Sequence, residues 1–352
     1  METTVARTHR RRSNRTASGV AVALLTLVLA AVALSWGSVS VPIDAVLRIL
    51  WSHISGTQPD TSSTWATIIL QIRLPRIVLA TLTGATLAVA GAVYQAIFRN
   101  PLADPYLIGV SSGASLGATL AILFVWKLSW GGMSAISLSA FAFAMGTTFL
   151  VYAIARVGTR TSTTMLILAG VAMSALLSAA TTFLMLTRQN AFQTVRVLGW
   201  IMGSLALASW GDVAAILPYV AVGGVTIAIF AYRLNVLQLG EEQAHVLGVP
   251  VEFSRVLLIG AASLVTAAAV SVSGVIGFVG LVVPHVVRMI WGPDHRFLLP
   301  MAALLGALLM ILADALSRTL IAPSEIPIGV VTACVGVPFF LYLLRRQRKE
   351  VF

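Results

Sequence analysis

The chain has very little charge and very little cysteine for its length. Of its 352 residues only 10% are charged, whereas 58% are hydrophobic. Soluble domains carry roughly 25% charged residues, so this composition excludes an ordinary soluble protein. The single cysteine, Cys334, excludes an internal disulfide framework and a metal site built from paired thiolates.

Sequence signatures of catalysis are also missing. No Gly-x-x-x-x-Gly-Lys-Ser/Thr string occurs, so the chain has no P-loop for nucleotide phosphates. No nucleophile with an adjacent base stands out, and the five histidines include no pair at metal-ligand spacing. We therefore expect no enzyme activity, no cofactor and no metal site. Energy for any transport must come from another polypeptide or from an ion gradient.

Long apolar runs are what the chain does have. A helix needs about 20 apolar residues to cross a bilayer, and unbroken runs such as residues 20–34 and 301–312 favour helices over membrane strands. The sequence predicts an all-α integral membrane protein with about ten membrane helices in one domain. Their expected ranges are 19–37, 69–98, 106–125, 134–155, 164–186, 212–231, 256–272, 275–291, 298–317 and 328–344.

Basic residues divide the predicted loops between two sides of the membrane. With a cytoplasmic N-terminus, 16 of the 23 Lys and Arg residues lie inside and 7 outside, which follows the positive-inside rule. This predicts a basic cytoplasmic tail over residues 1–18, a polytopic domain over 19–344 and a cytoplasmic tail over 345–352. The net charge of +11 then reflects topology and not a nucleic-acid partner. A cleavable signal peptide is the alternative for the first run, but no small-x-small cleavage site supports it.

Two unusual strings bracket the second predicted helix. Arg-Leu-Pro-Arg precedes it at residues 73–76, and Arg-Asn-Pro-Leu-Ala-Asp-Pro follows it at residues 99–105. Each proline fixes φ and disfavours helix in the residue before it, so both strings predict shaped helix boundaries. Three further distinctive strings lie at residues 274–285, 294–296 and 325–332.

In these strings the chain resembles the permease subunits of ABC importers that take up ferric siderophores, haem or cobalamin. The resemblance covers nearly the whole chain after residue 65. It implies a fold like that of a type II ABC importer permease, in a bacterial cytoplasmic membrane with both termini inside. It also implies partners: cytoplasmic P-loop ATPase subunits, an extracytoplasmic substrate-binding protein, and a second permease copy that is identical or closely paralogous.

The longest polar interruption between later spans lies at residues 233–255. Its centre, residues 239–249, predicts a short amphipathic helix that stops at Gly248. In the family that the chain resembles, this position is the cytoplasmic coupling helix that sits in a groove of the ATPase. The residues that the resemblance assigns to ATPase coupling are Gly240, Glu241, Ala244, Leu247 and Gly248. A solvated loop with one helical turn is the alternative.

Arg73, Arg76 and Arg318 are predicted on the outer side. Each can carry its charge to the membrane interface on its long stem. Alternatively the three form a cationic rim that docks carboxylates of the binding protein, as the resemblance implies. Asp314 is an isolated acid inside an apolar run. Its spacing of four from Arg318 favours a structural ion pair over a proton relay.

Small and weakly polar residues share one face of the fifth predicted helix. They are Gly170, Ser174, Ser178, Thr181 and Met185. Such residues suit helix packing as well as a translocation path, and the resemblance favours the path, because the family places this helix along the pore between two permease copies. Elsewhere Gly84, Ala88 and Gly91 are expected to let helix backbones approach closely.

We therefore predict the permease of an ATP-driven importer of an iron chelate. Ferric siderophore is the preferred substrate because it is the broadest class in the family, and haem and cobalamin are alternatives. A secondary transporter driven by an ion gradient is the competing class. It would need ionisable residues within the membrane, for which Asp314 is the one candidate.

Overall fold

The computed structural model describes residues 2–37, 39–56, 64–126, 128–130, 132–158, 160–188 and 190–351. Most side chains of the two predicted tails, residues 1–18 and 345–352, lie outside this description.

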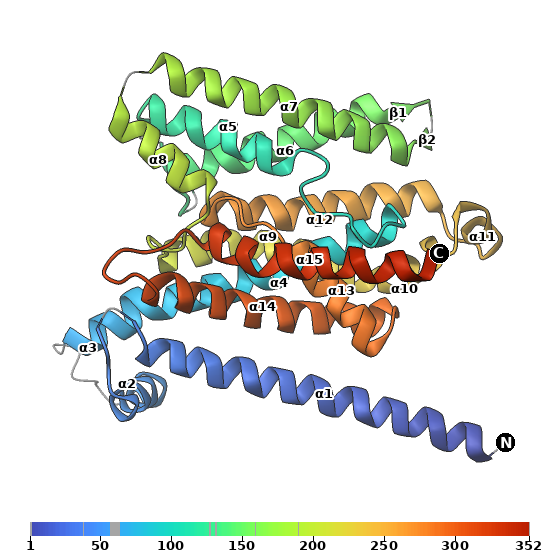
Figure 1. Ribbon diagram of the computed structural model, residues 1–352, viewed down its shortest axis with the longest axis horizontal. Coiled ribbons are helices and arrows are strands. Elements are labelled where there is room, and N and C mark those ends of the chain that lie inside the picture. The colour runs from blue at the N-terminus through green and yellow to red at the C-terminus, as the bar shows by residue number, and fades with distance from the viewer. Residues whose placement is uncertain are drawn as a thin grey trace.

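Ten helices of the described chain match the ten predicted spans (Figure 1). Seven of the helical segments are long and apolar enough to cross a membrane, and three shorter apolar segments complete the set. The predicted all-α membrane fold is thereby confirmed. The ten helices are α1 (Glu2–Ser35), α4 (Leu74–Ile97), α5 (Val110–Leu123), α6 (Ala135–Ala155), α7 (Thr163–Thr187), α9 (Trp210–Ile229), α12 (Val251–Ser273), α13 (Val279–Trp291), α14 (His295–Thr319) and α15 (Ile328–Val351).

Several short elements have no counterpart among the predicted spans. They are α2 (Ile43–Ser55), α3 (Thr64–Thr67), α8 (Ala191–Ile201), α10 (Ala231–Leu237) and a two-residue antiparallel pair, β1 (Arg156–Val157) with β2 (Arg160–Thr161). The predicted polar segment holds one more, α11 (Glu241–Val246). In α2, Val46 is buried while Leu47 and Trp51 are exposed, as in helices that lie along a membrane surface.

The two proline strings have different outcomes. The string at 73–76 does not end a helix: α3, a π-helical turn (Ile68–Arg73) and α4 form one continuous segment, with Pro75 in the first turn of α4. Proline is tolerated there because the first N–H groups have no intrahelical partner. The string at 99–105 is a boundary as predicted, since α4 ends at Ile97 and α5 begins only at Val110.

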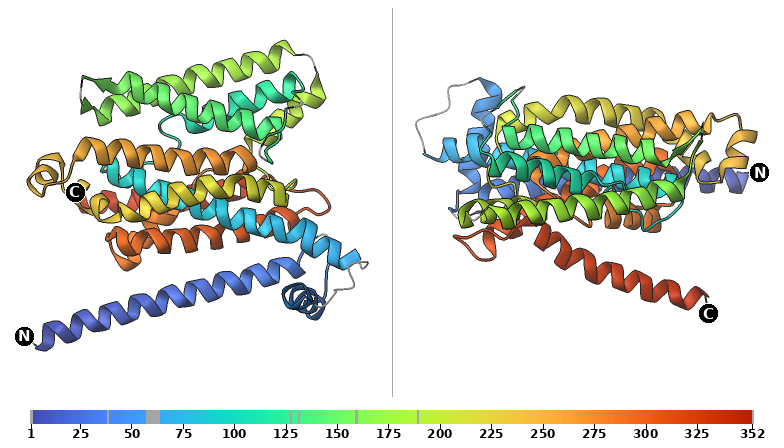
Figure 2. Two further views of the ribbon diagram at one scale, coloured as in Figure 1. Left: turned by 180° about the vertical axis from the view of Figure 1, so that it is seen from behind. Right: turned by 90° about the horizontal axis from the view of Figure 1, so that it is seen from above.

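The helices run roughly side by side, which separates the molecule into two ends (Figures 1 and 2). Both termini, α11 and the β1–β2 hairpin lie at one end, and α2, α3 and α8 lie at the other. We call these the α11 end and the α2 end. The right-hand view of Figure 2 shows α15 diverging from the bundle toward the C-terminus.

The N-terminal start of α15 is held by backbone hydrogen bonds. Ile328 N donates to Gly203 O, and Gly329 N donates to Met202 O, each at 3.0 Å. A side chain at Gly329 would overlap the Met202 carbonyl. From this clamp α15 leads away from α14, and its Val335, Leu341 and other apolar side chains are exposed.

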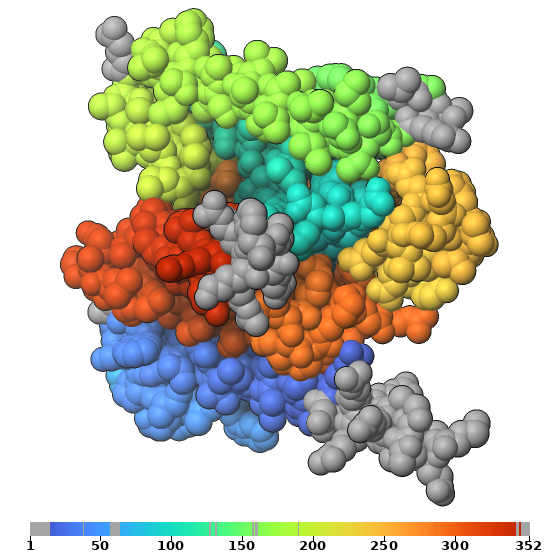
Figure 3. Space-filling model, turned by 45° about the vertical axis from the view of Figure 1, so that its right-hand side comes forward, coloured from blue at the N-terminus to red at the C-terminus, as the bar shows by residue number. Residues whose placement is uncertain are grey.

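In Figure 3 the segment that leads into α5 is visible in a recess between α7 and α13.

Helix α4 is the centre of the fold. It packs against α9, α12, α13 and α14, and two glycine pairs bring it close to its neighbours. A Cβ on Gly84 would overlap the Gly306 carbonyl of α14, and a Cβ on Gly91 would overlap the Gly280 carbonyl of α13. The prediction that Gly84 and Gly91 allow close helix approach is confirmed.

We predict that Gly84→Ala and Gly91→Ala each lower the thermal stability of the detergent-solubilised protein. A methyl group has no room in either contact, although alanine favours a helix over glycine by about 1 kcal/mol. Gly146→Ala in α6 is the matched control, because a Cβ there meets nothing within 4 Å. Each variant is heated to a series of temperatures and then analysed by size-exclusion chromatography, and the melting temperatures of the three variants are compared. Equal melting temperatures for all three variants would contradict the close-packing account.

Candidate functional site

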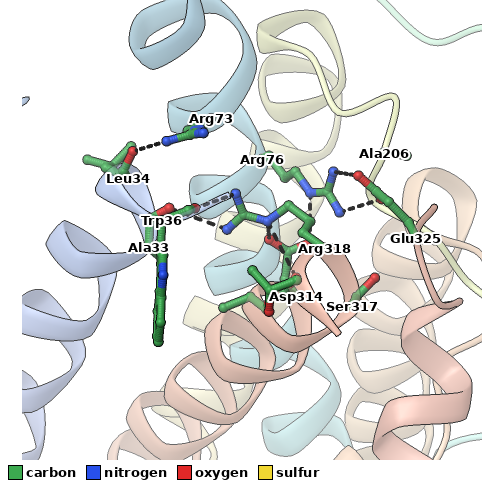
Figure 4. Close-up of polar contacts among 12 residues, drawn as sticks. Ala33, Leu34, Trp36, Arg73, Arg76, Ala206, Asp314, Ser317, Arg318 and Glu325 are labelled. Atoms are coloured by element: carbon green, nitrogen blue, oxygen red, sulfur yellow. Dashed lines mark hydrogen bonds and ion pairs between the residues drawn. The ribbon is translucent and has the colours of Figure 1, made fainter. Parts of the chain in front are cut away.

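At the α2 end, buried charged side chains join α1, α4 and α14 (Figure 4). Arg76 Nε donates to Asp314 Oδ1 at 2.7 Å, and its two terminal nitrogens donate to the two Glu325 oxygens at 2.9 and 2.8 Å. Arg318 Nε lies 3.1 Å from Asp314 Oδ2. Asp314 is 1% exposed, so both arginines neutralise a carboxylate that is cut off from water.

The same arginines also hold the end of α1. Arg73 Nη1 donates to the carbonyls of Leu34 and Ser35 at 2.6 and 3.1 Å. Arg318 donates to the carbonyls of Trp36 and Ala33 at 3.3 and 3.4 Å. The last carbonyls of a helix have no intrahelical partner. These guanidiniums therefore cap α1 from neighbouring helices.

The expectation of a cationic docking rim is corrected by this geometry. Arg73, Arg76 and Arg318 are between 5% and 7% exposed, and their donors are used by acceptors of the same chain. The expected ion pair of Asp314 with Arg318 is present. Two arginines that do have exposed side chains near this end are Arg188 and Arg196, at the end of α7 and in α8.

The predicted short helix exists as α11 (Glu241–Val246). Ala244 is fully buried against its own chain, whereas Leu239, Val246 and Leu247 are exposed, Val246 by 86%. Gly240 and Gly248 flank α11 with φ of +117° and +73°, where other residues are strained. Ala244 therefore anchors α11 from beneath, and the exposed apolar side chains at its C-terminal end are the ones that can contact another protein.

One buried arginine that the sequence analysis did not single out connects α11 to the rest of the fold. Arg255, near the start of α12, pairs with Glu241 of α11 and donates to the Thr161 carbonyl at 2.7 Å. Glu252 lies 3.5 Å from Arg255, accepts from Tyr152 at 3.2 Å, and also accepts from the Thr161 hydroxyl. We call these five residues the Arg255 network. Only the three-residue spacing of Glu252 and Arg255 could have signalled it from the sequence.

The expected polar stripe on α7 faces α5 more than open space. A side chain at Gly170 would overlap the Leu107 carbonyl, and Thr181 is 5% exposed. Ser174 accepts a hydrogen bond from Ser112 of α5 at 3.3 Å, and Met185 packs in a small apolar cluster. Ser178 is exposed. Gly170 and Thr181 are therefore buried and Ser174 and Met185 half-buried, so that only Ser178 of the five residues is exposed in this chain, and their place on a translocation path stays a prediction.

The described residues hold no group of three or more His, Cys, Asp or Glu side chains that could bind a metal ion.

We predict that Asp314→Asn strongly destabilises the protein, because it leaves Arg76 and Arg318 buried around a neutral group. Breaking a buried pair costs about 3–5 kcal/mol. Asp44→Asn is the control, because it removes an ion pair with Arg48 in which both side chains are largely exposed, and such pairs contribute about 0–1 kcal/mol. Melting temperatures measured in one detergent give the comparison. A decrease in melting temperature for Asp314→Asn no larger than that for Asp44→Asn would refute the role of Asp314 as the buried partner of the two arginines.

Glu325 gives the same cluster a dependence on pH. Its hydrogen bonds to Arg76 lower the pKa of the Glu325 carboxyl below its ordinary value. The contribution of the ionised Glu325 to the stability of the fold is therefore complete above the pKa that this carboxyl has in the unfolded chain. It is lost as the pH falls through the lower pKa of the folded protein. We expect the melting temperature of the wild type to drop more on acidification than that of Glu325→Gln. If the melting temperatures of the two proteins changed with pH in parallel, the stabilising role of the ionised Glu325 would be contradicted.

Comparison with known proteins assigns the chain to a family. It matches the FecCD transport family over residues 24–346. The uncharacterized ABC transporter permease protein YvrB of Bacillus subtilis is 41% identical over 343 residues, which are 97% of this chain and 96% of that one. The cobalamin import system permease protein BtuC of Halobacterium salinarum is 49% identical over 288 residues, 82% of this chain and 75% of that one. The hemin transport system permease protein HmuU of Yersinia pestis is 41% identical over 333 residues, which are 93% of this chain and 95% of that one.

A solved structure agrees with these relatives. It is described as an inward-facing conformation of an ABC transporter assigned to the metal-chelate type. The TM-score is 0.82 at 35% identity, over 94% of this chain and 99% of that one. Because the family match begins within α1, takes in every helix from α2 to α14 and ends within α15, the chain belongs to the FecCD transport family and is a permease subunit of an ABC transporter.

Proposed function

We propose that the chain is the permease of an ATP-driven importer that moves an iron chelate into the cytoplasm, with a ferric siderophore as the preferred substrate. Relatives of similar identity are named for hemin, for iron(3+)-hydroxamate and for molybdate. The names therefore support import by an ABC system more strongly than any one solute. Haem and cobalamin are the alternative cargoes.

The observation that carries the proposal is the Arg255 network. The family implies separate ATPase subunits, and α11 presents exposed Val246 and Leu247 at the α11 end. Arg255 joins Glu241 of α11 to the Thr161 carbonyl, two residues before α7 begins. A displacement of α11 by an ATPase would therefore reach α7 directly. Gly240, Glu241, Ala244, Leu247 and Gly248 form the coupling segment, with Leu247 as the contact and Ala244 as the anchor.

We place the translocation path along the open side of α7. Leu168, Leu176 and Phe183 are exposed there, and Ser178 is an exposed hydroxyl on the same helix. The family implies a dimeric arrangement, in which a second copy would face this side and the diverging α15. The buried or half-buried residues of the stripe, Gly170, Ser174, Thr181 and Met185, would keep α7 against α5 beside the path.

The two ends of the bundle have different partners in this proposal. Both termini and α11 lie at one end, which we propose to be cytoplasmic because the basic residues gather there. The substrate-binding protein would dock at the α2 end, where Arg188 and Arg196 are exposed. Arg73, Arg76 and Arg318 would affect docking only by fixing the helices below.

Secondary transport has less support. A proton or sodium relay needs an ionisable group that is free to change its charge within the membrane. The candidate acid, Asp314, is held by Arg76 and Arg318 at 2.7 and 3.1 Å. This arrangement favours a fixed charge.

Uptake into proteoliposomes tests the proposal. We expect the chain, assembled with its ATPase and supplied with its loaded binding protein, to import a ferric siderophore only with ATP. Liposomes loaded with ADP and a set with an imposed proton gradient are the controls. Uptake that follows the proton gradient without ATP would overturn the importer assignment, and ATP-dependent uptake of haem or cobalamin alone would correct the substrate.

Arg255→Gln should uncouple ATP hydrolysis from transport. The glutamine keeps much of the side-chain volume but loses the charge that joins α11 to the start of α7. We expect uptake to drop at least tenfold while the ATPase remains bound and active. Arg233→Gln is the control, because Arg233 has no ion pair among the described residues and contacts Ser254 and the Phe230 ring. Equal uptake by both variants would contradict the coupling route.

A further inference from the structure

A groove of about 490 Å³ opens between α4, α9 and α14. This volume lies within the roughly 300–1,000 Å³ of small-molecule sites. Its walls are mostly small or aliphatic, with Ala85 and Val89 on α4, Gly224 and Ala228 on α9, and Ala303 on α14. No step of the transport proposal uses it.

The groove lies on the outside of the bundle, away from the proposed path. Figure 2 shows α9 and α15 on opposite sides of the molecule. Beside the groove, α9 exposes Val222, Val225 and Ile229 by 58% to 72%. An apolar surface of this kind on a membrane helix faces lipid chains.

The groove runs along the helix axes. On α14 its lining extends from His295 to Ala303, about 12 Å at 1.5 Å per residue. On the facing side it extends from Val220 to Ala231, about 16 Å. An acyl chain of a bilayer lies in this direction.

One end of the groove is cationic. Arg296 lies at the α11 end, where its guanidinium stands 5.0 Å from the centre of the Tyr232 ring. It forms no ion pair with any residue that the structure describes. The neighbouring carboxylate of Asp294 instead accepts from Asn235 at 2.8 Å and from the Arg296 backbone N–H at 3.1 Å. The exposed Arg296 guanidinium can therefore donate to an anion such as a phosphate.

We propose that this groove binds an anionic phospholipid of the leaflet on the α11 side. One acyl chain lies between α4, α9 and α14, and the phosphate accepts hydrogen bonds from Arg296. Charge complementarity selects the lipid: basic pockets between membrane helices near the cytoplasmic surface favour anionic head groups. The site is independent of the transported solute.

Gly224 allows the groove to be filled without disturbing the fold. A Cβ on Gly224 meets nothing within 4 Å, whereas one on the adjacent Gly223 would collide with Val265 and Ala261. Gly224→Leu therefore occupies the space of the acyl chain. Gly146→Leu on α6 is the matched control, because Gly146 is equally open and lies outside the groove.

The experiment measures phospholipid retained by the permease and ATPase complex purified in mild detergent, with lipids extracted and quantified by mass spectrometry. Samples are first equilibrated with equal amounts of phosphatidylglycerol and phosphatidylcholine. We expect the wild type and Gly146→Leu to retain phosphatidylglycerol at least fivefold over phosphatidylcholine. Gly224→Leu and Arg296→Gln should each lower retained phosphatidylglycerol at least threefold, and Arg296→Lys should restore part of it.

Two results would overturn the proposal. One is equal retention of the two lipids by the wild type. The other is wild-type retention of phosphatidylglycerol by both Gly224→Leu and Arg296→Gln. Elution volume on size exclusion verifies that each variant is folded, and since lipid retention needs neither ATP nor solute, the outcome is separate from that of the transport experiment.

Discussion

A guanidinium buried in a membrane protein must find its acceptors in the same chain, and this requirement fixes both ends of the bundle. At the α2 end, Arg76 and Arg318 enclose Asp314 and bind α4 to α14, with Arg73 capping α1. At the α11 end, Arg255 joins α11, α12 and the strand before α7. Removing an acid from either cluster would leave a buried guanidinium with fewer partners to offset its desolvation.

Between these ends the fold depends on shape and not on charge. The glycines of α4 meet glycines of α13 and α14, so that backbones touch where side chains would normally separate them. Lipid chains are as apolar as leucine, and close packing therefore replaces the hydrophobic effect as the force between membrane helices. Charged clusters thus fix the two ends of the bundle, and backbone contacts at glycines join the helices between them. Such contacts leave whole helices able to move relative to one another.

The sequence predicted the ten membrane helices because each apolar run meets the length that a bilayer demands. It missed α2 and α8, which have 13 and 11 residues and are too short to read as spans. The pair of Asp314 with Arg318 was predictable since the two are one helical turn apart. The bond from Arg76 to Asp314 joins residues 238 positions apart, and no local pattern carries that information. For Ala244 and Thr181, helical spacing identified a shared face but not whether that face would be covered.

The clamp at the start of α15 makes this helix a lever. Its N-terminal end is tied through Ile328 and Gly329 to residues 202 and 203, and its other end stands away from the bundle. The helix has 24 residues and is therefore about 36 Å long. A rotation of about 10° around the clamp would shift its far end by roughly 6 Å at that length, while the clamped end would hardly move. A small change of angle at the clamp would thus become a large displacement at the C-terminal end of α15 and almost none at its N-terminal end.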